Sequence, residues 1–96
     1  MLRMAFSLLI RLGMTPKRFV YVLKSSQRTP RYYVGITSDR TQRLVWHNEG
    51  RCTHTAKYRP WLAHVTIEFP DEAHATRFER YLKSGSGRAF ARRHFD

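Results

Sequence analysis

The chain contains little cysteine and no long apolar run. Cys52 is the only cysteine in 96 residues, so neither an internal disulfide nor a cysteine-based zinc cluster can form. No apolar stretch approaches the roughly 20 residues that a bilayer-spanning helix needs. The apolar segment 4–10 stops at Arg11 and lacks the cleavage motif of a signal peptide. A lone cysteine is typical of a reducing compartment, and we expect a cytoplasmic location.

Acidic residues are scarce as well. Asp and Glu number 7 against 18 Lys and Arg, which gives a formal net charge of +11. Such an excess raises the free energy of the compact state through self-repulsion, and a polyanionic partner would relieve it. Nucleic acid is the commonest partner of this kind, with an anionic membrane surface and a merely basic protein as the alternatives. We expect DNA, with RNA as a second choice, and no membrane.

The rest of the composition is that of one small globular domain. Hydrophobic residues make up 42% and aromatic residues 14% of the chain, a composition typical of a globular and not of a disordered protein. Ninety-six residues leave room for a single modest core. We expect residues 17–95 to form the domain. Residues 1–16 are expected to be a tail that is disordered or, where translation begins at Met14, largely not translated.

Three segments have the pattern of β-strands: residues 19–24, 32–37 and 62–69. The first is apolar at both parities, so we expect it to be buried on both faces of a sheet. The polar segment 25–30 predicts a hairpin loop between the first two strands. The third strand alternates and has one polar face.

Alternation assigns the side chains of the second and third strands to faces of the sheet. Tyr33 and Gly35 share one face of the second strand. The opposite face of that strand carries Tyr32, Val34 and Ile36. In the third strand, Ala63, Val65, Ile67 and Phe69 are expected inward, and His64, Thr66 and Glu68 outward.

Three further segments have helical patterns. A first helix is predicted between a cap at residue 38 or 39 and a stop at Gly50. Asp71 opens a second helix, which the glycine-serine segment 84–87 ends, and residues 88–95 form a short final helix.

The element order is therefore β-β-α-β-α-α, with a basic loop over residues 51–60 before the third strand. This order predicts a small α/β (α+β) fold in which helices pack on a three-stranded sheet.

On the first helix, Arg40, Arg43 and His47 recur at i, i+3 and i+7, which places them on one face. A cationic stripe beside a strand that presents Tyr33 and Gly35 could hold a phosphate, because arginine donates two parallel hydrogen bonds and keeps its charge. Glycine would allow an approach that a side chain blocks. The alternative is an ordinary solvated basic helix face.

Glu79 lies at the border of the apolar stripe of the second helix. A carboxylate there could coordinate a hard divalent cation such as Mg²⁺. The alternative is an ion pair with Lys83 at i+4, and the two roles could coexist. Glu72, one heptad earlier, is a weaker candidate because it lies nearer the polar start of the helix.

Tyr21 and Tyr33 are expected on neighbouring antiparallel strands with both phenols on one face. Tyrosine has a pKa near 10 and acts as a base only if cations stabilise the phenolate. Packing across the hairpin is the alternative role. The remaining histidines have no spacing that indicates a zinc site.

In their order along the chain these residues resemble the GIY-YIG nuclease family. The segments "FVY" (19–21) and "YVG" (33–35) are similar to the two halves of the family signature. The likeness continues through "GITSDRTQRLVWHN", "RPWLAHVTIEF" and "ATRFERYLKSGSGRAF" and spans residues 17–95. The first half lacks its glycine and has Phe19 there, which suggests a variation of the scaffold.

The resemblance implies a three-stranded antiparallel sheet flanked by helices and metal-dependent hydrolysis of DNA phosphodiesters. The positions that match the residues of the family site are Tyr21, Tyr33, Gly35, Arg43, His47 and Glu79. By this likeness, Glu79 holds Mg²⁺ or Mn²⁺ and Arg43 neutralises a phosphate oxygen. Tyr21, Tyr33 or His47 activates the water, and the sequence leaves this choice open.

Further cations would contact the nucleic-acid backbone. They are Arg40, Lys57, Arg59, Lys83, Arg88, Arg92 and Arg93. We expect an endonuclease that is structure-selective or weakly sequence-specific, acts in DNA repair or recombination, and receives target selectivity from shape or from a protein partner. The alternative is a nucleic-acid-binding module that keeps the nuclease fold with little or no activity.

Overall fold

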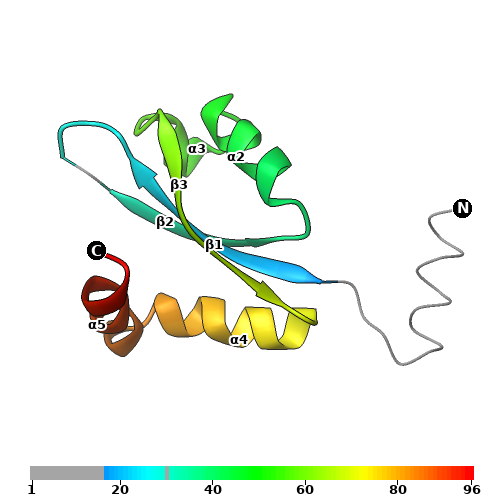
Figure 1. Cartoon of the computed structure of the whole chain (residues 1–96). Helices are drawn as coiled ribbons and strands as arrows, with labels where there is room; N and C mark the ends of the chain where they lie inside the picture. The colour runs from blue at the N-terminus through cyan, green and yellow to red at the C-terminus, as the bar shows by residue number, and fades with distance from the viewer. Residues whose placement is uncertain (1–16, 30) are drawn as a thin grey trace, which may run out of the picture.

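The computed structural model describes residues 17–29 and 31–96, so the expected tail over residues 1–16 lies outside the described residues. The described residues form three strands and four helices. Helices α2 and α3 lie on one face of the sheet, and α4 and α5 lie on the other (Figure 1). The elements are β1 (Arg18–Ser25), β2 (Tyr32–Thr37), α2 (Arg40–Asn48), α3 (Thr53–Ala56), β3 (Trp61–Phe69), α4 (Glu72–Leu82) and α5 (Gly85–His94).

The sheet is antiparallel, with strand order β2-β1-β3 and the first strand at its centre. The predicted burial of β1 on both faces is confirmed, since its residues 20–23 are all at most 5% exposed. Val20 and Val22 face α4, whereas Tyr21 and Leu23 face α2. The α+β class and the predicted order of the strands and the longer helices are confirmed, with the short helix α3 as an addition.

The second strand spans the predicted residues, and its alternation is as expected. Val34 and Ile36 pack in the cluster beneath α4, and Tyr33 packs in the cluster beneath α2. Gly35 is paired with Tyr21 of the central strand. This pairing places both signature tyrosines on the α2 face of the sheet, as the sequence predicted.

The third strand contains a β-bulge that the sequence analysis missed. Val22 lies opposite Val65, whereas Leu23 lies opposite Ala63, so His64 is an extra residue in β3. One extra residue reverses which face the preceding side chains take. The prediction that Ala63 points inward with Val65 is therefore wrong, and Ala63 is exposed.

The bulge lets this edge strand contribute to both cores. Trp61, before the bulge, is 2% exposed and packs with Tyr21 and Leu23. Val65 and Phe69, after it, pack in the cluster beneath α4.

Helix boundaries follow the predicted caps. The Asp39 carboxylate accepts the Gln42 N–H at 3.0 Å, which assigns the cap of α2 to Asp39. The Asp71 carboxylate accepts the His74 N–H at 2.9 Å and begins α4. Gly50 follows α2 with φ +79, a conformation that glycine adopts without strain.

Two helical segments differ from the prediction. The expected loop over residues 51–60 contains the short helix α3. This helix has only four residues, so its sequence is too short to show the 3.6-residue repeat of apolar positions by which longer helices are predicted. The final helix begins at Gly85 and not at residue 88. The hydroxyl of Ser84 accepts the Gly87 N–H at 3.2 Å, so the serine-glycine segment caps and starts α5 while it ends α4.

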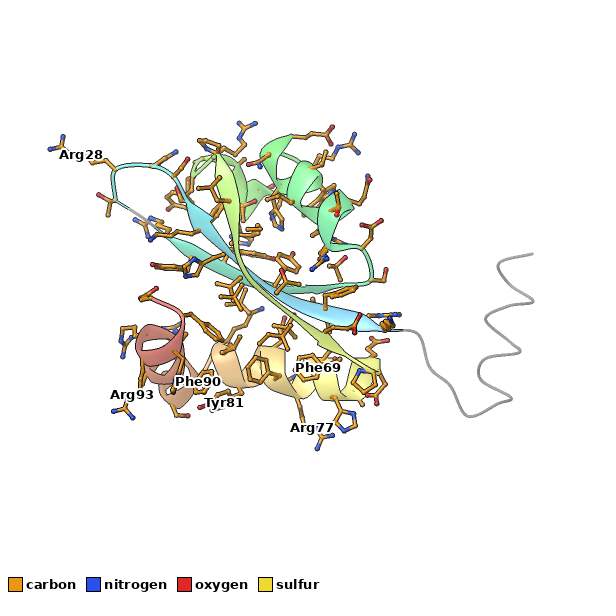
Figure 2. All side chains as sticks on the ribbon, in the orientation of Figure 1. Arg28, Phe69, Arg77, Tyr81, Phe90 and Arg93 are labelled. Carbon is orange, nitrogen blue, oxygen red and sulfur yellow. The ribbon has the colours of Figure 1, made fainter. Side chains whose placement is uncertain are left out.

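Aromatic side chains pack between helices α4 and α5. The ring of Phe90 in α5 packs edge-on against two rings of α4, with its centroid 6.3 Å from that of Phe78 and 5.9 Å from that of Tyr81. Figure 2 shows Tyr81 and Phe90 at this junction, whereas Arg77 and Arg93 project away from the sheet.

Gly87 is required at the point where α5 crosses the end of α4. A Cβ at residue 87 would collide with the Tyr81 carbonyl, whereas a Cβ at residue 85 would meet no atom. We therefore expect Gly87→Ala to lower the free energy of unfolding by about 1–3 kcal/mol. Gly85→Ala should be neutral or stabilise by up to about 1 kcal/mol. Urea unfolding of both variants measures this, and equal effects would contradict the assigned contact.

Candidate active site

Tyr21 of β1, Tyr33 of β2 and His47 of α2 meet on the α2 face of the sheet. The Tyr21 hydroxyl lies 3.0 Å from Nε2 of His47, a hydrogen bond between two side chains 26 residues apart. The ring of Tyr33 lies 4.7 Å from that of His47 and 6.1 Å from that of Tyr21, measured between centroids. Three of the residues singled out from the sequence are thus in contact.

Gly35 makes room for the Tyr21 phenol. A Cβ at residue 35 would collide with the ring and hydroxyl of Tyr21, its partner across the hairpin. The sequence analysis expected Gly35 to leave an opening beside a phosphate, but the space next to this glycine is occupied by the Tyr21 phenol. Gly35 therefore determines where the Tyr21 hydroxyl lies.

His47 is completely buried, at 0% exposure. Its Nδ1 lies 2.8 Å from the hydroxyl of Thr55, which itself lies 3.4 Å from the Cys52 carbonyl as a donor. A hydroxyl has one proton, so a Thr55 that donates to Cys52 accepts from the Nδ1–H of His47. Nε2 of His47 is then the atom that accepts from Tyr21.

Both members of the Tyr21–His47 pair are held uncharged near neutral pH. Burial, together with the positive charge of Arg43, lowers the pKa of His47 below its ordinary value of 6.5. Burial raises the pKa of Tyr21 well above 10; Tyr33 raises it further, and Arg43 opposes the rise. His47 therefore does not belong to a cationic stripe with the two arginines, as the helical spacing suggested, because it lies inward of that face.

The two arginines of α2 have different surroundings. Arg43 is half-buried, with its guanidinium 4.7 Å from the centroid of the Trp46 ring, and its charge acts on both Tyr21 and His47. Arg40 is exposed and lies 5.5 Å from the Phe19 ring. Of the two, Arg43 is beside the tyrosine–histidine pair.

Glu79 belongs to the other layer, on α4. Its side chain is 17% exposed, and its carboxylate forms an ion pair with Lys83 Nζ at 3.0 Å, the alternative role considered for it. Among residues 17–29 and 31–96, no described contact joins this carboxylate to Tyr21 or His47. Glu72 is far more exposed, at 70%, and lies 3.7 Å from Arg18.

Sequence reasoning missed three residues that hold the site together. Thr55 is 2% exposed and contacts His47. The side chain of Asn48 makes two hydrogen bonds to the backbone of Trp61, at 3.0 and 2.7 Å, and Trp61 Nε1–H donates to the Thr55 carbonyl at 2.9 Å. The one available signal was the polar residue Asn48 directly after His47. Neighbouring residues at the end of a helix point in different directions, so Asn48 could be expected to bind a different segment from the one that His47 contacts.

The cations expected to contact nucleic acid divide between the two layers. Lys57 and Arg59 follow α3, the helix that lies with α2 on one side of the sheet (Figure 1). The Arg59 Nε–H donates to the Ala56 carbonyl at 2.6 Å, so the base of this side chain is fixed. The cations on the α4 and α5 side are Lys83, Arg88, Arg92 and Arg93.

These features define a nuclease-type domain: an antiparallel sheet whose first two strands present paired tyrosines and a glycine to a helix with arginine and histidine. The family model described as the GIY-YIG catalytic domain matches residues 17–93, so the chain belongs to the GIY-YIG family. Domains of this family are generally nucleases that act on DNA. Among curated proteins, no sequence matches the chain significantly. None of the helices in the described residues has the length and apolarity to cross a bilayer.

The lowered pKa of His47 makes stability depend on pH. The unfolded imidazole, with a pKa near 6.5, binds protons that the buried imidazole does not, so the free energy of unfolding falls as pH drops below about 6.5. The contribution is fully present above that pH. We expect His47→Gln to flatten this slope in urea unfolding measured at successive pH values.

His54→Gln, at an exposed histidine of α3, is the matched control and should leave the slope unchanged. NMR titration of the imidazoles gives the pKa of His47 directly. A His47 that titrates at or above 6.5 would contradict its assignment as a buried neutral residue.

Proposed function

We propose that the protein is a metal-dependent DNA endonuclease that hydrolyses phosphodiester bonds. The observation that carries this proposal is the hydrogen-bonded chain from Tyr21 through His47 to Thr55, beside the guanidinium of Arg43. A buried chain of this kind accepts a proton without exposing the imidazole to solvent. Membership of the GIY-YIG family supports the same activity.

The proton acceptor for the attacking water is the pair of Tyr21 and His47 acting together. A free phenolate is disfavoured because the pKa of Tyr21 is raised, and His47, at 0% exposure, does not reach solvent. Water therefore gives its proton to the Tyr21 oxygen while the Tyr21 hydroxyl proton passes to Nε2 of His47. The hydroxide attacks phosphorus, the bond to the leaving oxygen breaks, and that oxygen takes a proton from solvent.

Arg43 would bind a non-bridging oxygen of the scissile phosphate. Its guanidinium keeps its charge at every physiological pH and is half-buried, where a charge–charge interaction is stronger than in water. Preorganised cations of this kind stabilise charge that develops in the transition state. Tyr33, in ring contact with His47, would position the attacking water.

The carboxylate of Glu79 would hold Mg²⁺ or Mn²⁺. Within residues 17–29 and 31–96, no three His, Cys, Asp or Glu side chains converge on one point. A single carboxylate nevertheless fits Mg²⁺, which keeps several waters and is bound through one or two carboxylates with phosphate oxygens. When bound, the ion would stabilise charge on the phosphate and the leaving oxygen. Lys83 Nζ must move away from Glu79 for this to occur.

We propose that selectivity is for DNA structure more than for sequence. The candidate contacts on the α2 side are Arg40, Lys57 and Arg59, and arginine and lysine bound to phosphates fix position without reading bases. A role in repair or recombination, with a protein partner supplying targets, is consistent with such contacts.

A binding module with little activity is the second candidate function. The ion pair of Glu79 with Lys83 and the raised pKa of Tyr21 favour it, because both must be overcome before the chain can cleave DNA.

Nicking of a supercoiled plasmid with Mg²⁺ or Mn²⁺, beside flap and branched oligonucleotides, tests the two candidates. We expect Glu79→Gln to reduce cleavage by at least about 100-fold, the loss expected when several kcal/mol of transition-state stabilisation are removed. DNA affinity in EDTA should stay within about twofold, since the cations that supply binding are intact.

Glu72→Gln is the matched control, because it removes the same charge from the same helix at an exposed position. It should cleave at the wild-type rate. DNA binding by the wild-type protein without cleavage of any substrate would favour the binding module, and full activity of Glu79→Gln would remove Glu79 from the site.

Thr55 gives a separate prediction for the proton acceptor. Thr55→Val keeps the shape but removes the partner of His47 Nδ1, so we expect the cleavage rate to fall about 10–100-fold, as for other residues that orient a functional histidine. Thr55→Ser retains the hydroxyl and should restore most of the rate. The pH profile of cleavage should shift in Thr55→Val with DNA affinity unchanged, and an unaltered rate and profile would contradict the role of Thr55.

A further inference from the structure

A pocket of about 610 Å³ lies on the side of the sheet opposite the tyrosine–histidine pair, between β2 and α5. Its walls are mostly apolar and come from all three strands and from α4 and α5. The residues that form them include Val22, Val34, Leu82, Ala91 and Phe95. The volume is within the roughly 300–1,000 Å³ of small-molecule sites.

One end of the pocket carries hydrogen-bonding groups. The Tyr32 hydroxyl donates to Oδ1 of Asp96 at 2.9 Å, which fixes the carboxylate at the pocket wall. Nε2 of His64, the residue at the bulge of β3, is buried and has no hydrogen-bond partner among the described residues. Asp96 Oδ1 lies 3.7 Å from it, too far for a hydrogen bond. A buried polar atom left in this way is costly unless a ligand or water satisfies it.

Cations border the same pocket. Lys83 at the end of α4 and Arg88 and Arg92 of α5 all line it. The two arginines are four residues apart on α5 and therefore project from one side of the helix. Among the described ion pairs neither arginine has a carboxylate partner, so both guanidinium groups are available to an anion.

We propose that this pocket binds a nucleotide, with the base between the apolar walls and the phosphate at the arginines. A simple anion would bind the arginines but would leave the apolar walls unfilled. A fatty acid would fill the apolar walls but would offer no hydrogen-bond donor to the Asp96 carboxylate. An aminated base offers a flat apolar face to Phe95 and an amino group to the Asp96 carboxylate.

The nucleotide has two sources, a free nucleotide or an unpaired nucleotide of a bound strand. The second source rests on the proposed function, whereas binding of a free nucleotide does not. Lys83 lines the pocket and also contacts Glu79, so a phosphate bound there competes with Glu79 for the same ammonium group.

Calorimetric titration of the full chain with AMP in EDTA tests the site without any cleavage. Adenosine, ribose 5-phosphate and inorganic phosphate are titrated in parallel. We expect each to bind at least about 10-fold more weakly than AMP, because adenosine lacks the phosphate and the other two lack the base. NMR shifts on AMP addition should include the imidazole of His64.

Arg92→Ala should weaken AMP binding at least about 10-fold, as expected when a charge-assisted phosphate contact is removed. Arg77→Ala is the matched control, because this exposed arginine of α4 points away from the sheet (Figure 2) and its loss changes the net charge equally. Equal effects of the two variants, or AMP binding no tighter than ribose 5-phosphate, would overturn the proposal.

Competition in EDTA distinguishes the two sources. Displacement of AMP by an oligonucleotide duplex with one unpaired adenosine, but not by the fully paired duplex, assigns the pocket to a strand nucleotide. AMP binding that neither duplex displaces assigns it to a free nucleotide. These titrations measure binding without metal, so they do not depend on whether the protein cleaves DNA. If AMP does not bind, the proposed nucleotide site is wrong, even if the protein proves to be a nuclease.

Discussion

The contact of the Tyr21 phenol with Gly35 and His47 is the constraint on which the α2 side of the molecule depends. The ring fits only because its cross-strand partner is glycine, and its hydroxyl requires a buried acceptor, which His47 supplies. A buried imidazole in turn requires a partner for its second nitrogen. Thr55 fills that role and explains why a four-residue helix interrupts the connection to β3.

The sequence predicted those parts of this arrangement that repeat regularly. Alternation placed Tyr33 and Gly35 on one face of β2, and side-chain caps located the starts of α2 and α4, because both signals are local. The bulge at His64 changes register without changing the pattern of apolar residues. Thr55 lies in a polar segment in which Thr53 and His54 could equally well have bound the His47 imidazole. Only the contacts of the folded chain show that Thr55 is the residue that does so.

The bulge has consequences on both sides of the sheet. It turns Trp61 toward Tyr21, where its backbone is bound by Asn48 and its indole by the Thr55 carbonyl, and so fixes α2 and α3 over the site. It also leaves His64 without a strand partner, with its Nε2 buried beside the pocket of the opposite layer. One inserted residue therefore shapes both the candidate active site and the proposed nucleotide pocket.

The acidic residues explain why the charge excess is not neutralised within the fold. Asp39 and Asp71 cap helices, and Asp96 is held by Tyr32. The glutamates are all in ion pairs, and those are Glu49, Glu68, Glu72 and Glu79. Every carboxylate is thus engaged locally, and most lysines and arginines of the described residues lack an acidic partner. Glu79 has the least exposed side chain of these glutamates, and its partner Lys83 also lines the proposed nucleotide pocket. A phosphate bound in that pocket would therefore compete with Glu79 for the Lys83 ammonium group.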